Sequence, residues 1–239
     1  MLRLVVLSDV HGNRWALDAV LADVERDPPD VYLVLGDLAA DGPDPVGALA
    51  RLRALPNATF VRGNTDRYLG DLGAVEDPGG EWSDLIATWQ WAVDCLGDEG
   101  RRFLDGLPTD VFLDTPAGPV LATHGLPGQD ERWIDPGDVQ GLEKLEWRGA
   151  HVLVVGHTHV PFVLRGNKGT VINPGSVGLS PQTQWRASYA RVDLFPGGQV
   201  AVRHAQVAWD VAAYLDAFEG GIPKNQKSLP MLRALRQLI

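Results

Sequence analysis

The stretch Leu4-Val-Val-Leu-Ser-Asp9-Val-His11 decides the fold, because a buried strand in it ends at two polar side chains. Apolar residues from Leu2 to Leu7 predict the strand, and apolar residues at helical spacing from Trp15 to Val24 predict a helix behind it. The same order returns in Val31–Leu35, which is followed by a helical pattern at 46–55. Strands that alternate with helices form parallel sheets. The first half of the chain therefore predicts an α/β protein.

The second half of the chain is richer in strand patterns. Residues 71–108 carry helical patterns without a strand, which we interpret as a helical excursion from the sheet. Short strands are predicted at 58–61, 111–113, 119–123, 152–155, 161–164, 170–172, 188–194 and 200–207. Helices are predicted within about 209–239, at 209–219 and 228–238, and no linker divides the chain. We therefore expect a single domain over residues 1–239.

Composition narrows the classes of function. The chain has 239 residues, with 21 Lys and Arg against 31 Asp and Glu, which gives a net charge of −10. A protein that grips long DNA or RNA needs a basic face, so we expect no long nucleic acid as partner, whereas a small phosphorylated substrate is allowed. No apolar run is long enough for a spanning helix or a signal peptide, and Cys95 is the one cysteine. We expect no membrane partner and a cytoplasmic location. The sequence gives no indication of the oligomeric state.

Five of the predicted strands end at side chains that can bind a metal ion. In chain order these are Asp9, His11, Asp37, Asn64, Asp66, His124, His157 and His159. The carboxyl ends of strands form the ligand crevice of an open α/β sheet, so these side chains are expected to converge although they span 150 positions. Carboxylate oxygens and imidazole nitrogens without a thiolate suit Mn, Fe, Zn or Ni.

Each of these residues also has a purely structural interpretation. A lone Asp after a strand commonly caps a helix, and a lone histidine is commonly structural. The joint pattern favours a metal site, because four of the six histidines lie at such strand ends. Alternate side chains of an extended segment point the same way, so Asp9 with His11, and His157 with His159, are expected to aim together.

These blocks also resemble the signature of a known family. Asp9-x-His11, Gly36-Asp37, Gly63-Asn64-x-Asp66, His124-Gly125 and Gly156-His157-x-His159 are similar, in order and spacing, to the calcineurin-like metallophosphoesterases. Asn173-Pro-Gly-Ser-Val-Gly178 resembles a strand ending of the small bacterial and archaeal phosphodiesterase branch. The resemblance implies a four-layer αββα sandwich with a helical insertion, and a hydrolase that acts on phosphoric ester bonds.

The resemblance further implies a binuclear metal centre. The ligands that it implies are Asp9, His11 and His159 for one divalent ion, Asn64, His124 and His157 for the other, and Asp37 between them. Manganese is the first expectation, with Fe, Zn or Ni as alternatives. Two ions about 3.5 to 4 Å apart acidify a shared water, so the implied nucleophile is a bridging hydroxide. The implied catalytic set is Asp37, Asn64, His124 and Asp66, the last of which would orient a ligand or water.

Two positions depart from the family's pattern. Many members carry a histidine where this chain has Thr65, whose hydroxyl is too weakly acidic for a general acid near neutral pH. We therefore expect either substrates whose leaving group needs little protonation or a metal-bound water that serves as the acid. Protein Ser/Thr phosphatases of the superfamily place a phosphate-binding arginine where this chain has Asp41, which would repel a dianionic phosphate. The departure at Asp41 favours diesters over phosphoproteins.

The expected function is a metal-dependent phosphodiesterase that acts on a small molecule. Arg14 and Thr65 are candidate substrate-binding residues, although a surface role is the simpler interpretation of Arg14. Trp82, Trp89 and Trp91 either pack in the core or line a base-stacking pocket. The alternatives are a phosphomonoesterase, a dinucleoside polyphosphate hydrolase and a non-catalytic metal-binding scaffold, as in a retromer subunit of this fold. The intact ligand set favours an enzyme over the scaffold.

Overall fold

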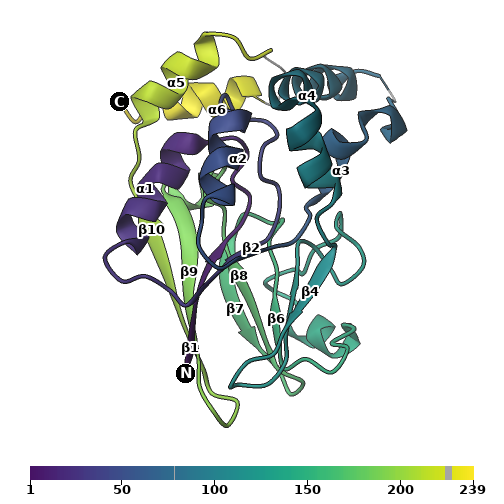
Figure 1. Ribbon diagram of the computed structural model, residues 1–239, viewed down its shortest axis with the longest axis vertical. Coiled ribbons are helices and arrows are strands. Elements are labelled where there is room, and N and C mark those ends of the chain that lie inside the picture. The colour runs from purple at the N-terminus through teal and green to yellow at the C-terminus, as the bar shows by residue number, and fades with distance from the viewer. Residues whose placement is uncertain (78, 224–227) are drawn as a thin grey trace.

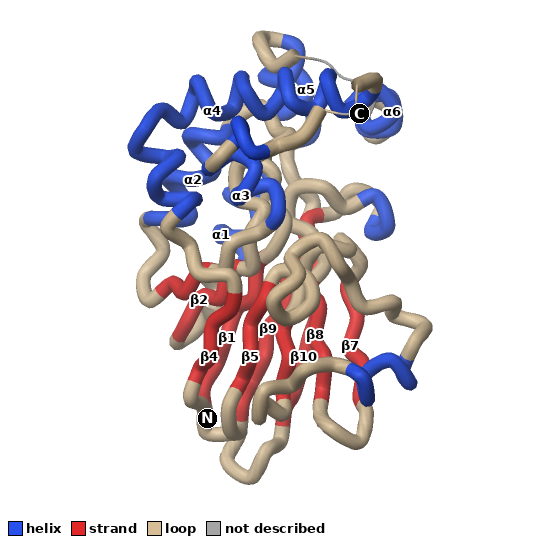
Figure 2. The backbone as a smooth tube through the Cα atoms, turned by 90° about the vertical axis from the view of Figure 1, so that its right-hand side faces the viewer, coloured by secondary structure: helices blue, strands red, loops and turns tan. Residues whose placement is uncertain are grey.

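Two mixed five-stranded sheets form the centre of the computed structural model, which describes residues 1–77, 79–223 and 228–239 (Figures 1 and 2). The first sheet has the order β10-β9-β1-β2-β3, with β1 (Leu2–Leu7), β2 (Val31–Val34), β3 (Ala58–Phe60), β9 (Ala187–Leu194) and β10 (Val200–Val207). The second has the order β4-β5-β6-β8-β7, with β4 (Asp110–Leu113), β5 (Val120–Thr123), β6 (Val152–Val154), β7 (Pro161–Arg165) and β8 (Thr170–Pro174). Strands β1, β2 and β3 run parallel, as predicted, and β9 and β10 are antiparallel additions.

Strand β1 shows why its sequence is apolar throughout. Leu4 and Val6 face the second sheet and belong to the core between the two sheets. Val5 and Leu7 point the other way, into a core shared with the helices. Successive side chains of a strand alternate between its faces, so a strand that is covered on both sides reads as a continuous apolar run. The predicted α/β class and layered sandwich are confirmed.

Helices cover the outer face of the first sheet and one end of the molecule. Helices α1 (Arg14–Val24) and α2 (Pro45–Arg53) pack on that face, and each begins at a capping side chain, Asn13 or Asp44. The outer face of the second sheet is covered by a long loop with its 3₁₀ helix η2 (Val139–Lys144). A further 3₁₀ helix, η3 (Pro181–Thr183), precedes β9.

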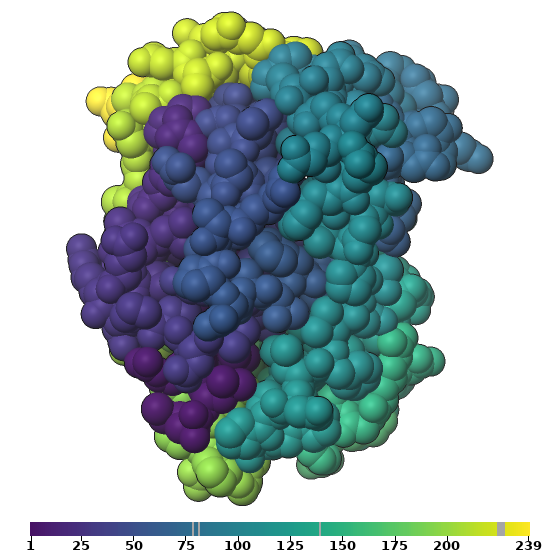
Figure 3. Space-filling model, in the orientation of Figure 1, coloured from purple at the N-terminus to yellow at the C-terminus, as the bar shows by residue number. Residues whose placement is uncertain are grey.

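The remaining helices gather above the strand ends (Figure 1). They are α3 (Asn64–Gly70), η1 (Leu72–Ala74), α4 (Glu81–Asp105), α5 (Val211–Glu219) and α6 (Ser228–Leu235). Figure 3 shows the C-terminal helices in yellow against the teal and blue segment that contains α4. Trp91 of α4 packs against the cluster formed by α5 and α6, so segments far apart in sequence form one helical layer. None of the helices in the described part of the chain is long and apolar enough to cross a membrane.

The helical excursion begins earlier than the sequence predicted. Helix α3 starts at Asn64 rather than after residue 70, because Asp66 accepts a hydrogen bond from Gly63 N (2.9 Å) and so caps the first turn. The sequence predicts two helices in this region, at 82–96 and 101–107, and α4 indeed consists of two helical segments that are divided at Gly97, where φ is 60° and ψ is −172°. Residue 78 of the excursion and residues 224–227 of the C-terminal region lie outside the described residues. The organisation of residues 1–239 as a single domain stays a prediction.

Candidate metal centre

All seven predicted ligands meet where β1, β2, β5, β6 and the start of α3 come together. Three of them, Asp9, His11 and His159, form what we call the His11 group. In this group His159 Nε2 lies 3.2 Å from both Asp9 Oδ1 and His11 Nε2. His11 Nε2 lies 3.9 Å from the same carboxylate oxygen. The three donor atoms therefore surround one point.

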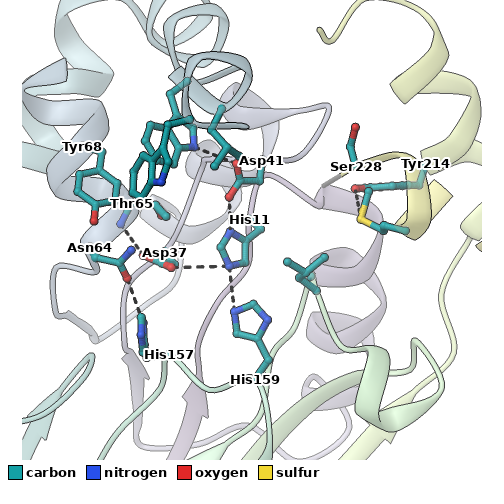
Figure 4. Close-up of a pocket in the computed structure, with 16 residues that line it drawn as sticks. His11, Asp37, Asp41, Asn64, Thr65, Tyr68, His157, His159, Tyr214 and Ser228 are labelled. Atoms are coloured by element: carbon teal, nitrogen blue, oxygen red, sulfur yellow. Dashed lines mark hydrogen bonds and ion pairs between the residues drawn. The ribbon is translucent and has the colours of Figure 1, made fainter. Parts of the chain in front are cut away.

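A second set of three donors lies beside the first. We call Asn64, His124 and His157 the His124 group. Asn64 Oδ1 lies 3.0 Å from His124 Nε2 and 3.1 Å from His157 Nδ1, and these two nitrogens are 3.2 Å apart. Asp37 Oδ2 lies 3.7 Å from His11 Nε2 (Figure 4). The same oxygen lies 3.5 Å from His124 Nε2, so it faces both groups. One carboxylate oxygen is thus placed where a ligand shared by two ions would stand.

The donor atoms fit divalent metal ions. Ions bound at about 2.0 to 2.2 Å hold neighbouring nitrogen and oxygen ligands roughly 3 Å apart. Five of the six spacings within the two groups match this, at 3.0 to 3.2 Å, and the sixth, from His11 Nε2 to Asp9 Oδ1, is 3.9 Å. Asp9 Oδ1 is fully buried and, although His159 is 3.2 Å away, it accepts no hydrogen bond of normal geometry from the described residues. A buried carboxylate oxygen in this state needs a positive partner. The set holds nitrogen and oxygen and no sulfur, which suits Mn, Fe, Zn or Ni.

Buried carboxylates dominate the electrostatics of the cluster. Burial opposes the charged form of His11, but Asp41, Asp37 and Asp9 outweigh it and raise the pKa of His11 to about 9. Burial acts to raise the pKa of Asp9, yet the neighbouring histidines hold it well below its usual range. The pKa of His157 is lowered, by burial and then by His124. The neighbouring carboxylates therefore favour a proton on His11, and a metal ion bound at His11 Nε2 would displace it.

The ligand loops are tight turns rather than extended segments. Five ligands have φ between 49° and 67°, namely Asp9, His11, Asp37, His157 and His159. The sequence prediction of extended segments with alternate side chains was wrong in this respect, although the side chains do converge. Left-handed φ in non-glycine residues costs about 1 kcal/mol or more each and persists only where surrounding contacts hold it. Two such contacts are the hydrogen bonds from Asp9 N to Gly36 O (3.0 Å) and from His11 N to Asp37 O (2.9 Å).

Asp66 holds the turn that presents Asp37. Its carboxylate accepts hydrogen bonds from the backbone N–H groups of Asp37 (2.8 Å), Leu38 (2.9 Å) and Gly63 (2.9 Å). Burial, followed by the charge of Asp37, raises the pKa of Asp66 to about 6. A Cβ on Gly63 would stand 2.1 Å from Asp37 Oδ1, so only glycine lets the two turns approach. Asp66 therefore orients the backbone of a ligand.

His124 is oriented from behind in a similar way. Its Nδ1 lies 2.6 Å from Leu35 O, and His124 is fully buried. A carbonyl accepts only, so Nδ1 carries the proton and Nε2 keeps its lone pair for a metal ion. The backbone directly after β2 thereby fixes the tautomer of a predicted ligand that directly follows β5.

A cavity of about 330 Å³ opens onto the ligands from the side of the helical layer (Figure 4). His11, Asp37, Asn64, His157 and His159 line its floor. Its walls are mainly aromatic and apolar, formed by Tyr68, Trp82, Leu85, Trp89, Leu179, Tyr214 and Met231. The rings of Tyr68 and Trp89 are stacked, with centroids 4.9 Å apart. The cavity is therefore suited to an organic group attached to a phosphate on the floor.

The other predicted site residues lie in different places. Thr65 lines the cavity, and its N–H donates to Asp37 Oδ1 (3.0 Å). Arg14 does not line it, because its guanidinium pairs with Asp44 and Asp18 on the outer helices, and we withdraw it as a substrate-binding candidate. Of the three tryptophans in α4, Trp82 and Trp89 reach the cavity, and the i, i+7 spacing that puts them on one helix face was visible in the sequence.

Three aromatic residues near the site, Tyr68, Tyr214 and Trp133, were not predicted, whereas Asp41 was expected near the phosphate. Tyr68 lies two residues after Asp66, and Tyr214 reaches the cavity from the C-terminal helices, 146 positions further along. Asp41 accepts a hydrogen bond from Trp89 Nε1 (2.9 Å) and lies 3.5 Å from His11 Nδ1, so it joins the cavity wall to a ligand. Trp133 lies outside the cavity with its ring 5.9 Å from that of His157, and nothing in its sequence surroundings indicates this.

Comparison with known proteins defines the class. The model of the calcineurin-like phosphoesterase superfamily domain matches residues 2–195. The chain therefore belongs to the calcineurin-like phosphoesterase superfamily and is a hydrolase that acts on phosphoric ester bonds. The matched region contains all seven predicted ligands, whereas α5 and α6, which complete the cavity, lie beyond it.

Individual relatives are similar over most of the chain. The uncharacterised protein MJ0912 of Methanocaldococcus jannaschii is 28% identical over 240 residues, covering 92% of this chain and 94% of the relative. The phosphodiesterase YfcE of Escherichia coli is 26% identical over 202 residues, covering 81% and 88%. A metallophosphoesterase structure from Sphaerobacter thermophilus aligns with a TM-score of 0.77 and 25% identity, covering 98% of this chain and 99% of the other.

Proposed function

We propose that the chain is a metal-dependent phosphodiesterase that hydrolyses small-molecule phosphodiesters at a binuclear centre. The observation that carries the proposal is that two groups of three donor atoms meet on one oxygen of Asp37 at the floor of an aromatic cavity. A protein that held metal only for its own stability would have no need of an open cavity over the ligands. The phosphodiesterase named among its relatives supports the same reading.

The chain's own residues would divide the work between the two sides of Asp37. The His11 group would hold one divalent ion and the His124 group the other, with Asp37 shared between them and manganese as the first choice. Two such ions would acidify a shared water and neutralise phosphate oxygens. Asp66 keeps Asp37 in place through the backbone, and Leu35 keeps Nε2 of His124 free for coordination. The cavity would bind the organic part of the substrate.

The charge of the cavity favours diesters over monoesters. None of the described residues that line it is a lysine or an arginine, and Asp41 adds a carboxylate to its wall. A phosphodiester carries one negative charge at neutral pH, whereas a phosphomonoester approaches two. With no lysine or arginine among the described lining residues, the monoester would depend on the metal ions to offset its second charge. The diester, with one charge, needs less compensation.

Thr65 favours substrates with good leaving groups. Its hydroxyl is buried at the cavity and has no hydrogen-bond partner among the described residues. The O–H can donate a hydrogen bond to an ester oxygen, but its proton is too weakly acidic to be transferred near neutral pH. Phenol-like alcohols leave without full protonation, so aryl esters should be cleaved faster than alkyl esters.

An activity panel against a metal series tests the proposal. The substrates are bis(4-nitrophenyl) phosphate, 4-nitrophenyl phosphate and a dinucleoside polyphosphate, each assayed with Mn, Fe, Zn, Ni or excess chelator. We expect metal-dependent turnover with the highest kcat/KM for the diester. A higher value for the monoester or the polyphosphate would replace the proposed substrate class, and no turnover with any metal would favour the scaffold.

A further inference from the structure

The loop that follows β5 places a tryptophan at the metal centre. Residues 125–138 leave the strand directly after His124, and Leu126 N donates to both Gln129 O (3.1 Å) and Arg132 O (2.8 Å). The loop therefore folds back on itself within a few residues. A Cβ on Gly125 would stand 2.5 Å from Arg132 O, which shows how closely its two arms approach. Trp133 comes immediately after this turn.

Helix α3 fixes the position of the loop. The Arg67 guanidinium donates to both carboxylate oxygens of Asp130, at 2.9 and 3.1 Å, and to Glu131 at 2.7 Å. Tyr68, whose ring lines the cavity, also donates its O–H to Glu131. A bidentate arginine pair is a directional contact that holds its partners in one orientation. The loop with Trp133 and the cavity wall are thus fastened to the same turn of helix.

Trp133 itself is left open to solvent. Its side chain is 61% exposed, whereas the next residue, Ile134, is buried at 7% and anchors the loop in the core over the second sheet. The indole centroid is 5.9 Å from the imidazole of His157, at an interplanar angle of 33°. The large exposed ring of Trp133 therefore provides a stacking surface next to a predicted ligand. Because the fold already holds the loop in place, little conformational entropy is lost when a substrate binds there.

We propose that Trp133 forms a second ester-group subsite, so that the enzyme selects diesters with an aromatic group on each side of the phosphate. The inference rests on the proposed function. A phosphodiester has two organic groups on one phosphorus atom. The cavity accepts one of them, and the other, directed away from the cavity, meets Trp133 beside His157. A monoester has only one such group and gains nothing from the second surface.

Inhibition by two small diesters measures the subsite directly. Diphenyl phosphate and dimethyl phosphate carry the same charge, but only the first can stack. The Ki of each is measured against bis(4-nitrophenyl) phosphate turnover in the Mn-loaded enzyme. Loss of one stacking surface commonly weakens binding by a factor of about 10. Trp133→Ala should therefore raise the Ki of diphenyl phosphate about tenfold, leave that of dimethyl phosphate unchanged, and be largely rescued in Trp133→Phe.

Phe112→Ala is the matched control, because Phe112 is a 48% exposed aromatic residue on β4 that does not line the cavity. It should change neither Ki.

Unchanged inhibition in Trp133→Ala overturns the subsite. An equal rise for both inhibitors also overturns it, because Trp133 would then merely support His157. A change of oligomeric state on size-exclusion chromatography would assign the ring to an interface instead. If the wild-type enzyme hydrolyses no diester with any metal, the proposed function fails before the variant is considered.

Discussion

Asp41→Asn tests how the cavity discriminates between phosphate charges. Asp41 lies between the aromatic wall and the His11 group, 2.9 Å from Trp89 Nε1 and 3.5 Å from His11 Nδ1. Asparagine keeps the size of the side chain and an oxygen that can accept from Trp89. The substitution therefore removes a negative charge while it preserves the shape of the cavity. We expect it to improve the hydrolysis of monoesters relative to that of diesters.

The magnitude follows from Coulomb's law. A phosphate on the cavity floor lies beyond the imidazole of His11, at roughly 8 Å from the Asp41 carboxylate, where one unit of charge interacts by about 2 kcal/mol at an effective dielectric constant of about 20. A dianionic monoester differs from a monoanionic diester by about one such unit. The Asp41 side chain is 27% exposed, so solvent reduces the interaction. The ratio of kcat/KM for diester over monoester should therefore fall by about tenfold, which corresponds to about 1.4 kcal/mol.

The assay compares bis(4-nitrophenyl) phosphate with 4-nitrophenyl phosphate in the same Mn-loaded preparation. The ratio is the readout because weaker orientation of His11 would slow both substrates alike and cancel. Asp18→Asn, which removes a carboxylate that pairs with Arg51 outside the cavity, should leave the ratio unchanged. A ratio in Asp41→Asn equal to that of the wild type, with both activities measurable, would refute the electrostatic reasoning.

Three further predictions concern the metal centre. Asp37→Asn should lose both tight metal binding and turnover, because the shared oxygen becomes a neutral amide; two metal ions per chain and full activity in this variant, measured by elemental analysis and assay, would contradict the assignment. Mn at about 100 times its Kd should stabilise the fold by about 2.7 kcal/mol and raise the Tm by roughly 5 to 10 °C over the chelated protein in calorimetry, whereas an unchanged Tm would argue against a folded-state site. Asp66→Ala leaves three buried N–H groups without their acceptor and should lower the free energy of unfolding by about 3 kcal/mol or more in urea; a loss under 0.5 kcal/mol would show that the turn does not depend on it.

The strands and the convergence of the ligands could be predicted from sequence because both follow from local patterns. Strand β1 is buried on both faces, so its apolar run is unbroken, and parallel strands bring their carboxyl ends to one edge. Helix α3 was missed because it has only seven residues and its first turn lies inside the Asn64 block. The left-handed turns at Asp9 and His11 were missed because backbone contacts distant in sequence impose them.

The sequence offered Trp82 and Trp89 as candidates for a pocket wall, but the complete cavity could not be predicted, because its other walls come from segments that meet only in the folded chain. Tyr68 and Trp89 are stacked although they lie on different helices, and Tyr214 joins them from beyond the region that the superfamily shares. Trp133 lies in a loop without periodicity, and its place beside His157 depends on the ion pairs of Arg67. The residues proposed to select the substrate therefore come together through tertiary contacts, whereas the metal ligands could be identified from local sequence motifs.

An anomalous-difference map from crystals of the Mn-loaded protein tests the central claim most directly. We predict two peaks per chain, about 3.5 to 4 Å apart, one within the His11 group and one within the His124 group, with Asp37 between them. A single peak, or peaks away from Asp37, would contradict the binuclear centre on which the proposed phosphodiesterase activity depends.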